Sequence, residues 1–232
     1  MSKKSGISLQ SYSPYSGIEE YCFIEGTSGT AYPGVRIENI SFPLTIPAIQ
    51  AAVCSCLANG DQPAILYQQK PESELLSYWV DQYSLAVKQE IPAFQNLYDP
   101  LLTSVADVAA LLKKLAEKAI VPHSGFEVAA LLETPAGFIC GVNVEVSAWS
   151  LGLCAERVAI SRAVAAGYTE FTSLHIYAPK GDFSSPCGAC RQILTEWLPD
   201  KIVKLHHGDG SLSTHYTSHL LPYGFTSNSL KK

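Results

Sequence analysis

Apolar residues in the second half of the chain recur at helical spacing in some segments and form short runs in others. In residues 104–120, SVADVAALLKKLAEKAI, apolar side chains lie three and four positions apart, which predicts an amphipathic helix. The runs FEVAALLET and FICGVNVEV, separated by PAG, predict a β-hairpin. The segment LCAERVAISRAVAAG is rich in alanine and ends at Gly167, which indicates a helix with a glycine cap.

The pattern beyond this helix continues with alternating strands and helices. SLHIYAP predicts a buried strand, CGACRQILTEWLP a second helix, and KIVKLHHGDG a further strand and turn. The order helix, hairpin, helix, strand, helix, strand is typical of an α/β protein. We therefore predict a three-layer α/β/α sandwich on a mixed sheet.

Parts of this pattern occur twice. YSPYSG recurs as IVPHSG at an offset of 108 (120 − 12), and GVRIEN recurs as GVNVEV at an offset of 107 (141 − 34). AAVCSCLANG lies over VAISRAVAAG, again at 107 (158 − 51). Three blocks in one order at nearly one offset indicate two tandem copies of one unit. We predict domains at residues 1–100 and 101–232, with the boundary near LYDPLLTS, residues 97–104.

Composition narrows the function classes. With 47% hydrophobic and 16% charged residues among 232, the chain has the composition of a globular protein, and its net charge of −5 favours neither nucleic acid nor anionic membranes as partners. No apolar run approaches the roughly 18–20 residues that span a bilayer, and MSKKSGISLQ lacks the apolar region of a signal peptide. Seven cysteines, an odd number, argue against a disulfide framework, so we expect a reducing, cytoplasmic location.

Three cysteines and one acid are placed for metal chemistry. Cys154 and Cys187 fall at the predicted starts of helices, where the helix dipole stabilises a thiolate, and Cys190 follows one turn later. Three thiolates leave the fourth position of a tetrahedral zinc ion open to water. Glu156 shares the first turn with Cys154 and could move protons there. On these residues alone, buried structural thiols and a surface carboxylate remain an alternative.

The combined pattern C-x-E followed by P-C-x-x-C resembles that of the zinc nucleoside deaminases. The resemblance is closest to cytidine deaminases with three cysteine ligands, and it extends from VPHSGFEVAAL through GVNVEVSAWSLGLCAERVA and SPCGACRQILTEW to LLPYGF. It implies that Cys154, Cys187 and Cys190 hold one Zn²⁺ per chain, in the second copy. It also implies that zinc-bound hydroxide deaminates cytidine or deoxycytidine to the uridine product, with Glu156 as proton shuttle.

The same resemblance implies contacts around a nucleoside. Asn143 and Glu145 would hold the ribose 3′-hydroxyl, Phe126 would pack on the pyrimidine, and the Ala155 N–H would donate to the base carbonyl. Arg157 would offset the charge of the thiolates, and Phe225 would enter a neighbouring subunit's pocket. Without the downstream motif, Asn143 and Glu145 would be read as a polar strand edge, and the two phenylalanines as core residues.

The family pattern is altered at three positions near these residues. His123, Val146 and Trp149 stand where the family commonly has tyrosine, asparagine and tyrosine. None of these changes removes a predicted ligand or the predicted acid. They bear on substrate fit and on subunit contacts instead.

The first copy lacks this chemistry. Pro47 stands at the position of Cys154 (154 − 107), Ile49 at that of Glu156 (156 − 107), Arg36 at that of Asn143 (143 − 107) and Ile18 at that of Phe126 (126 − 108). We therefore expect a degenerate domain that replaces a neighbouring subunit, so that a homodimer imitates a tetramer. The remaining cysteines, at positions 22, 54, 56 and 140, are assigned to core packing by default.

Three functions fit the sequence. The first is a cytidine and deoxycytidine deaminase of pyrimidine salvage, acting on small-molecule nucleosides. The second is a deaminase of another cytosine-containing substrate, a polynucleotide or a nucleoside antibiotic, although the acidic charge disfavours a polynucleotide. The third is an inactive binding protein that keeps the fold, against which the complete ligand set with Glu156 argues.

Overall fold

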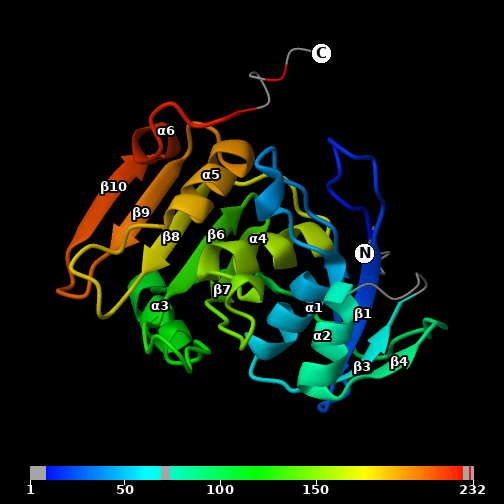
Figure 1. Cartoon of the computed structure of the whole chain (residues 1–232). Coiled ribbons are helices and arrows are strands. Elements are labelled where there is room, and N and C mark those ends of the chain that lie inside the picture. The colour runs from blue at the N-terminus through cyan, green and yellow to red at the C-terminus, as the bar shows by residue number, and fades with distance from the viewer. Residues whose placement is uncertain (1–8, 69–73, 227–229, 231–232) are drawn as a thin grey trace, which may run out of the picture.

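Two sheets lie side by side in the computed structural model of the chain, which describes residues 9–68, 74–226 and 230 (Figure 1). The first half contains, in order, β1 (Tyr21–Gly26), β2 (Ala31–Val35), the 3-10 helix η1 (Phe42–Leu44), α1 (Ala48–Leu57), β3 (Pro63–Tyr67), α2 (Glu74–Tyr83) and β4 (Ala86–Lys88). The second half contains β5 (Leu101–Leu102), α3 (Val108–Ala116), β6 (Ala129–Thr134), β7 (Gly137–Val142), η2 (Trp149–Leu151), α4 (Ala155–Ala165), β8 (Ser173–Tyr177), α5 (Gly188–Trp197), β9 (Ile202–His206), β10 (Leu212–Tyr216) and α6 (Thr217–Leu220).

The two halves share one strand topology. The first sheet has the order β2-β1-β3-β4, and the second contains the same order as β7-β6-β8-β9, flanked by β5 and β10. In both, the first three strands are antiparallel to their neighbours and the last pair, β3–β4 or β8–β9, is parallel. The predicted α/β class, the mixed sheet and the tandem copies are thereby confirmed.

The second sheet is covered on both faces. Every residue of β8 is buried, as is the segment Ala129–Leu132 of β6. Such burial of consecutive strand residues requires packing on both sides of the sheet, as in a three-layer sandwich. In the described part of the first copy no helix corresponds to α3.

The predicted helix at residues 104–120 is shorter than expected. The helix α3 begins after Asp107, whose side chain accepts a hydrogen bond from the Ala110 N–H at 3.0 Å. This N-cap satisfies a backbone donor that has no partner within the helix, and so fixes the start of α3. The other elements predicted in the second copy are present as helix, hairpin, helix, strand, helix and strand.

Two equivalent glycines allow each hairpin to approach its helix. A Cβ on Gly34 would lie 2.2 Å from the Ala48 carbonyl oxygen, and a Cβ on Gly141 would lie 2.2 Å from that of Ala155. Such distances are far below van der Waals contact, so only glycine fits at either site. The close approach places the first turns of α1 and α4 directly on β2 and β7.

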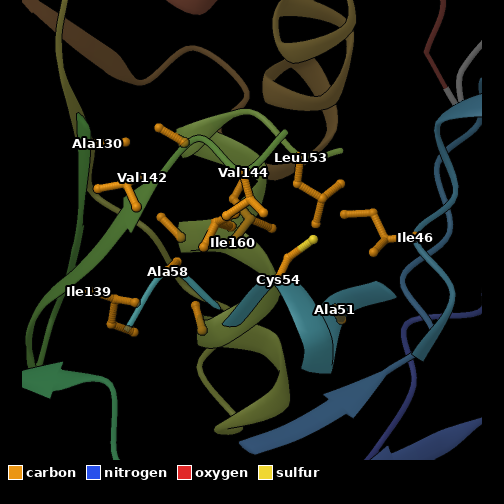
Figure 2. Packing of buried hydrophobic residues seen from close by; sticks show 14 of the residues in the cluster. Ile46, Ala51, Cys54, Ala58, Ala130, Ile139, Val142, Val144, Leu153 and Ile160 are labelled. Carbon is orange, nitrogen blue, oxygen red and sulfur yellow. The ribbon is translucent and has the colours of Figure 1, made fainter. Parts of the chain in front are cut away.

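A single core joins the two copies. Figure 2 shows Ile46, Ala51 and Cys54 of the first copy packed in one cluster with Leu153 and Ile160 of the second. The helices α1 and α4 are in contact, and nearly all of their residues are buried. Burial on all sides explains why neither helix shows a strong polar face in the sequence. Among the described helices, none has the length and apolar character needed to cross a membrane.

Candidate active site

Three thiols meet at the ends of two helices. The Sγ atoms of Cys154, Cys187 and Cys190 all lie within 4.8 Å of one another, and that of Cys154 is 3.7 Å from that of Cys187. Cys154 is the N-cap of α4, and Cys187 is the N-cap of α5 and accepts a hydrogen bond from the Cys190 N–H. In the described ranges, no other group of three or more histidine, cysteine or acidic side chains is so arranged.

The segments before both helices are tied to the rest of the fold. Leu153 pairs with Val144 through two backbone hydrogen bonds of 2.9 Å, so Cys154 follows directly from the end of the β6–β7 hairpin. On the other side, the Arg191 guanidinium donates to the Pro186 carbonyl at 2.9 Å and to Ser185 Oγ at 2.7 Å. These bonds fix the backbone on which each cysteine stands.

The thiols titrate as one group. Hydrogen bonds from Cys154 and Cys190 lower the pKa of Cys187 below its ordinary value. The hydrogen bond with Cys187 raises the pKa of Cys154, and that with Cys154 raises the pKa of Cys190. One thiolate is therefore stabilised by two neutral thiols, whereas three thiolates this close require a cation between them. Three soft sulfur donors at such spacing fit a zinc ion and leave its fourth position open.

Glu156 is buried beside the thiols. Its side chain is 3% exposed, lies in the first turn of α4 and forms a hydrogen bond with Cys190. Burial raises the pKa of this carboxyl to about 7. A group with a pKa near neutrality can both accept and release a proton under physiological conditions.

Asn143 and Glu145, the two residues predicted to bind the ribose, are held by hydrogen bonds with backbone groups. Asn143 Oδ1 accepts from the Val128 N–H at 2.8 Å, and its Nδ2 donates to the Phe126 carbonyl at 2.9 Å. Glu145 accepts from the His123 and Ser124 N–H groups, each at 3.0 Å, and from Ser124 Oγ. Burial favours the neutral form of Glu145, but the bonds from Ser124 and His123 outweigh it and lower its pKa.

The first copy contains the same carboxylate contact. Glu38, at the position of Glu145, accepts from the backbone of Tyr15 and Ser16 and from Ser16 Oγ. The acid thus has a structural role in both copies, because it fixes the loop that precedes β1 or β6. At Glu145 a substrate role would be added to this one.

The other predicted substrate residues lie around the hairpin and α5. Ala155 is the first residue of α4, where a backbone N–H has no acceptor within the helix. The Phe126 ring is 40% exposed and lies against Gly181. The Phe225 ring is 47% exposed, and its carbonyl accepts from Gln192 Nε2 on α5. Among the described residues, Phe225 forms no hydrogen bond or ring contact with the cysteines or Glu156.

Arg157 faces the other copy. Its Nη2 donates to the Leu44 carbonyl at 3.0 Å, and its buried Nε has no hydrogen-bond partner. The guanidinium lowers the pKa of Glu156, opposing the effect of burial. Arg157 therefore affects the pKa of Glu156, while its hydrogen bond to the Leu44 carbonyl joins the second copy to the first.

The residues that join the two copies were not predicted from the sequence. Arg162 donates from Nε and Nη2 to Ser55 Oγ and the Ser55 carbonyl, and from Nη1 to the Cys140 carbonyl. The offset of 107 already relates Arg162 to Ser55 (162 − 107), so two equivalent positions touch across the interface. The equivalence of these two positions is the feature of the sequence that could have predicted their contact, because residues near a two-fold axis contact their own equivalents.

At the positions equivalent to Cys154 and Glu156, the first copy has no side chain that could bind a metal ion or move a proton. Pro47 is the N-cap of α1, as Cys154 is of α4, and Ile49 is buried at the position of Glu156. Of the cysteines without a predicted ligand role, Cys22, Cys54 and Cys56 are buried and Cys140 is half-buried. Burial raises the pKa of Cys54, so this thiol is held neutral.

Comparison with known proteins places the second copy in a family. A family model described as "Cytidine and deoxycytidylate deaminase zinc-binding region" matches residues 103–205. A cytidine deaminase of Sporosarcina psychrophila is 38% identical over 128 residues, which are 54% of this chain and 94% of that protein. A blasticidin-S deaminase of Bacillus cereus is 32% identical over 110 residues, 44% of this chain and 78% of that protein.

A solved structure of a cytidine deaminase from Burkholderia pseudomallei also matches. It is 36% identical, with a TM-score of 0.48, and covers 51% of this chain and 99% of its own. Each of the two curated relatives corresponds to about half of the chain, and the family match falls on the half that contains Cys154, Cys187 and Cys190. The match to the Sporosarcina psychrophila cytidine deaminase extends over nearly the whole length of that protein. Together with the thiol cluster and the buried acid, this match shows that the chain belongs to the cytidine deaminase family.

Proposed function

We propose that the protein hydrolyses cytidine or deoxycytidine to uridine or deoxyuridine and ammonia. The observation that carries this proposal is the buried carboxyl of Glu156 beside three converging thiols. Cys154, Cys187 and Cys190 would hold one zinc ion. When bound, zinc supplies a Lewis acid that lowers the pKa of a water in its open position to about 7.

Glu156 moves the protons in this proposal. Its carboxylate accepts a proton from the attacking water and delivers it to N3 of the pyrimidine. A second proton, from the hydroxyl that the water leaves on C4, passes through the same carboxylate to the amino nitrogen. The amino group then leaves C4 as ammonia, and the hydroxyl becomes the carbonyl of the uracil product. A pKa near 7 suits both transfers, because the group neither binds nor releases the proton too strongly.

The remaining residues orient the nucleoside. We assign the base carbonyl to the Ala155 N–H, the pyrimidine face to Phe126 and the ribose 3′-hydroxyl to Asn143 and Glu145. The hydrogen bonds of Asn143 and Glu145 to loop 123–128 fix their polar atoms before substrate arrives. A site built in this way discriminates against ligands that lack the hydroxyl, since its polar groups would then stay unpaired.

The first copy, residues 1–100, would be a non-catalytic domain, and residues 101–232 the catalytic one. A homodimer of such chains would present four deaminase-like units. Support comes from Phe42 and Trp149, which occupy equivalent positions (149 − 107) and are 83% and 64% exposed. Large exposed aromatic side chains are typical of interfaces. Phe225 would then contribute to a site across such an interface. A light-scattering mass near that of one chain would contradict the dimer.

We also propose that the protein acts in pyrimidine salvage, in the cytoplasm. The test of the proposed function is turnover by purified protein, followed by the loss of cytidine absorbance with uridine and ammonia identified as products. Cytidine and deoxycytidine should be deaminated, and cytosine and single-stranded DNA should not. No turnover by protein that contains one zinc per chain would contradict the assignment.

One alternative substrate class has a specific observation behind it. A relative similar to this chain is a blasticidin-S deaminase, so a nucleoside antibiotic belongs among the substrates tested. His123 and Trp149, which form an edge-to-face ring contact, depart from the family pattern beside the site. Faster deamination of blasticidin S than of cytidine would favour this alternative.

A further inference from the structure

The helix α2 of the first copy contacts the loop that leads to the thiols. Tyr78 Oη accepts from the Ala148 N–H at 3.1 Å and lies 3.0 Å from Ser147 Oγ. One turn further along the helix, Gln82 Oε1 accepts from Ser147 Oγ at 2.6 Å. Two side chains of the first copy, which lacks the predicted metal ligands, therefore hold one end of a loop in the second copy, which contains them.

The other end of the loop is held by α1. Gln50 is buried, and its Nε2 donates to the Leu151 carbonyl at 2.8 Å. Three residues further lies Cys154, the N-cap of α4. The segment Ser147–Leu153 thus connects Glu145 to the first thiol, and both of its ends are fixed by helices of the first copy. None of these three contacting side chains belongs to the chemistry described above.

An equivalent contact exists on the opposite side of the interface, where the loop that is held leads to no thiol. Glu196 of α5 accepts from Asn39 Nδ2 at 2.7 Å and from the Ile40 N–H at 3.0 Å, and Ile40 is the equivalent of Ser147 (147 − 107). There the helix of the second copy holds the loop that leads to Pro47. The arrangement is shared by both copies, but the loop held by Tyr78 and Gln82 ends at a predicted ligand, whereas the loop held by Glu196 ends at Pro47.

We propose that Tyr78 and Gln82 are positioning residues, through which the first copy fixes the loop Ser147–Leu153 and with it Cys154. The inference deepens the proposed function and rests on it for its kinetic consequence. Loss of the contact would let the loop move, so that Cys154 and the adjoining Glu145 are held less firmly. Metal would then be released faster and substrate bound more weakly, without the loss of any ligand.

The test compares Tyr78→Phe with Tyr67→Phe in the full chain. Tyr67 donates to Glu25 Oε2 at 2.8 Å within the first copy, so its variant also loses one hydroxyl contact but leaves the loop intact. Amide exchange of a peptide covering residues 144–153 should accelerate about fivefold to tenfold in Tyr78→Phe, because the Ala148 N–H loses its acceptor. Release of zinc to a chelator should accelerate several-fold, and KM should rise more than kcat falls.

Equal exchange and equal zinc release in Tyr78→Phe, Tyr67→Phe and the unaltered protein would overturn the proposal. So would equal acceleration in both variants, since it would reflect a general loss of stability. Should Tyr78→Phe fail to fold, Ser147→Ala removes the contacts of Ser147 with Tyr78 and Gln82 and leaves that of Ala148 with Tyr78. Exchange of the peptide and release of zinc should then accelerate in the same direction but by less, and no acceleration of either would overturn the proposal. Exchange and zinc release need no turnover, so failure of the protein to deaminate cytidine would contradict the proposed function alone.

Discussion

Gln50 and Arg157 occupy equivalent positions in the two copies, and each donates a hydrogen bond across the interface to the other's 3-10 segment. Gln50 Nε2 lies 2.8 Å from the Leu151 carbonyl oxygen, and Arg157 Nη2 lies 3.0 Å from that of Leu44. The acceptors are themselves equivalent (151 − 107 = 44). The pair shows that the copies are related by an approximate two-fold axis, on which Arg162 and Ser55 meet.

Replacing Gln50 tests this relationship. Gln50→Met keeps the volume of the side chain but leaves the Leu151 carbonyl without its partner, which should lower the free energy of unfolding by about 1–2 kcal/mol. Urea unfolding measures the change. Gln62→Met is the matched control, because Gln62 is exposed. A control that loses as much stability as Gln50→Met would contradict the assignment.

Local signals were sufficient for much of the fold. Periodicity, the PAG turn and the repeated blocks each depend on residues close in sequence, and they predicted the hairpin β6–β7, the helices α4 and α5 and the tandem copies. The later start of the predicted helix, after Asp107, is also a local effect, since an acidic N-cap followed by apolar residues marks a helix start.

The site could be predicted only in part. The spacing C-x-E and P-C-x-x-C predicted that three thiols and Glu156 lie together, and in the structure the three sulfur atoms lie within 4.8 Å of one another. The contacts of Tyr78 and Gln82 with Ser147 join residues about 70 positions apart. Neither helix spacing nor a motif relates such positions, so they follow only from the packing of one copy on the other.

Removal of one thiol should abolish metal binding. Cys187→Ser replaces a thiolate by a hydroxyl, which does not ionise near neutral pH and binds zinc poorly. Zinc content should fall from one per chain to near zero, as measured by elemental analysis of protein purified without chelator. Cys140→Ser should keep one zinc per chain, because Cys140 lies outside the thiol cluster. Retention of zinc by Cys187→Ser would contradict the predicted ligand set.

Neutralising the buried acid should abolish turnover and leave the metal in place. Glu156→Gln keeps the shape of the side chain but cannot accept a proton, so kcat should fall by about 10²–10⁴-fold. Zinc content should stay at one per chain, since Glu156 is not a predicted ligand. Glu117→Gln, on the exposed end of α3, serves as the control and should retain full activity. Unchanged kcat in Glu156→Gln would favour a binding protein over an enzyme.

A buried histidine outside the site should make folding sensitive to mild acid. Burial, together with the charge of Lys204 and the neighbouring His206, lowers the pKa of His175 to about 4 against the opposing effect of Glu133. His175 is nearly inaccessible in β8, and its Nδ1 lies 3.1 Å from His206 Nε2. Protonation therefore favours the unfolded chain, in which the pKa is about 6.5.

The sign of the pH effect follows from this difference. Below pH 6.5 the unfolded state binds more protons than the native state, so the contribution of His175 is complete above that pH and is lost as the pH falls towards 4. Between pH 7.5 and 5.0 it should cost about 2 kcal/mol. Urea unfolding of the protein and of His175→Gln at both pH values isolates this contribution from that of the thiols, because the cysteines are the same in both. The variant should lose less stability on acidification, and an equal loss in both proteins would show that another group is responsible.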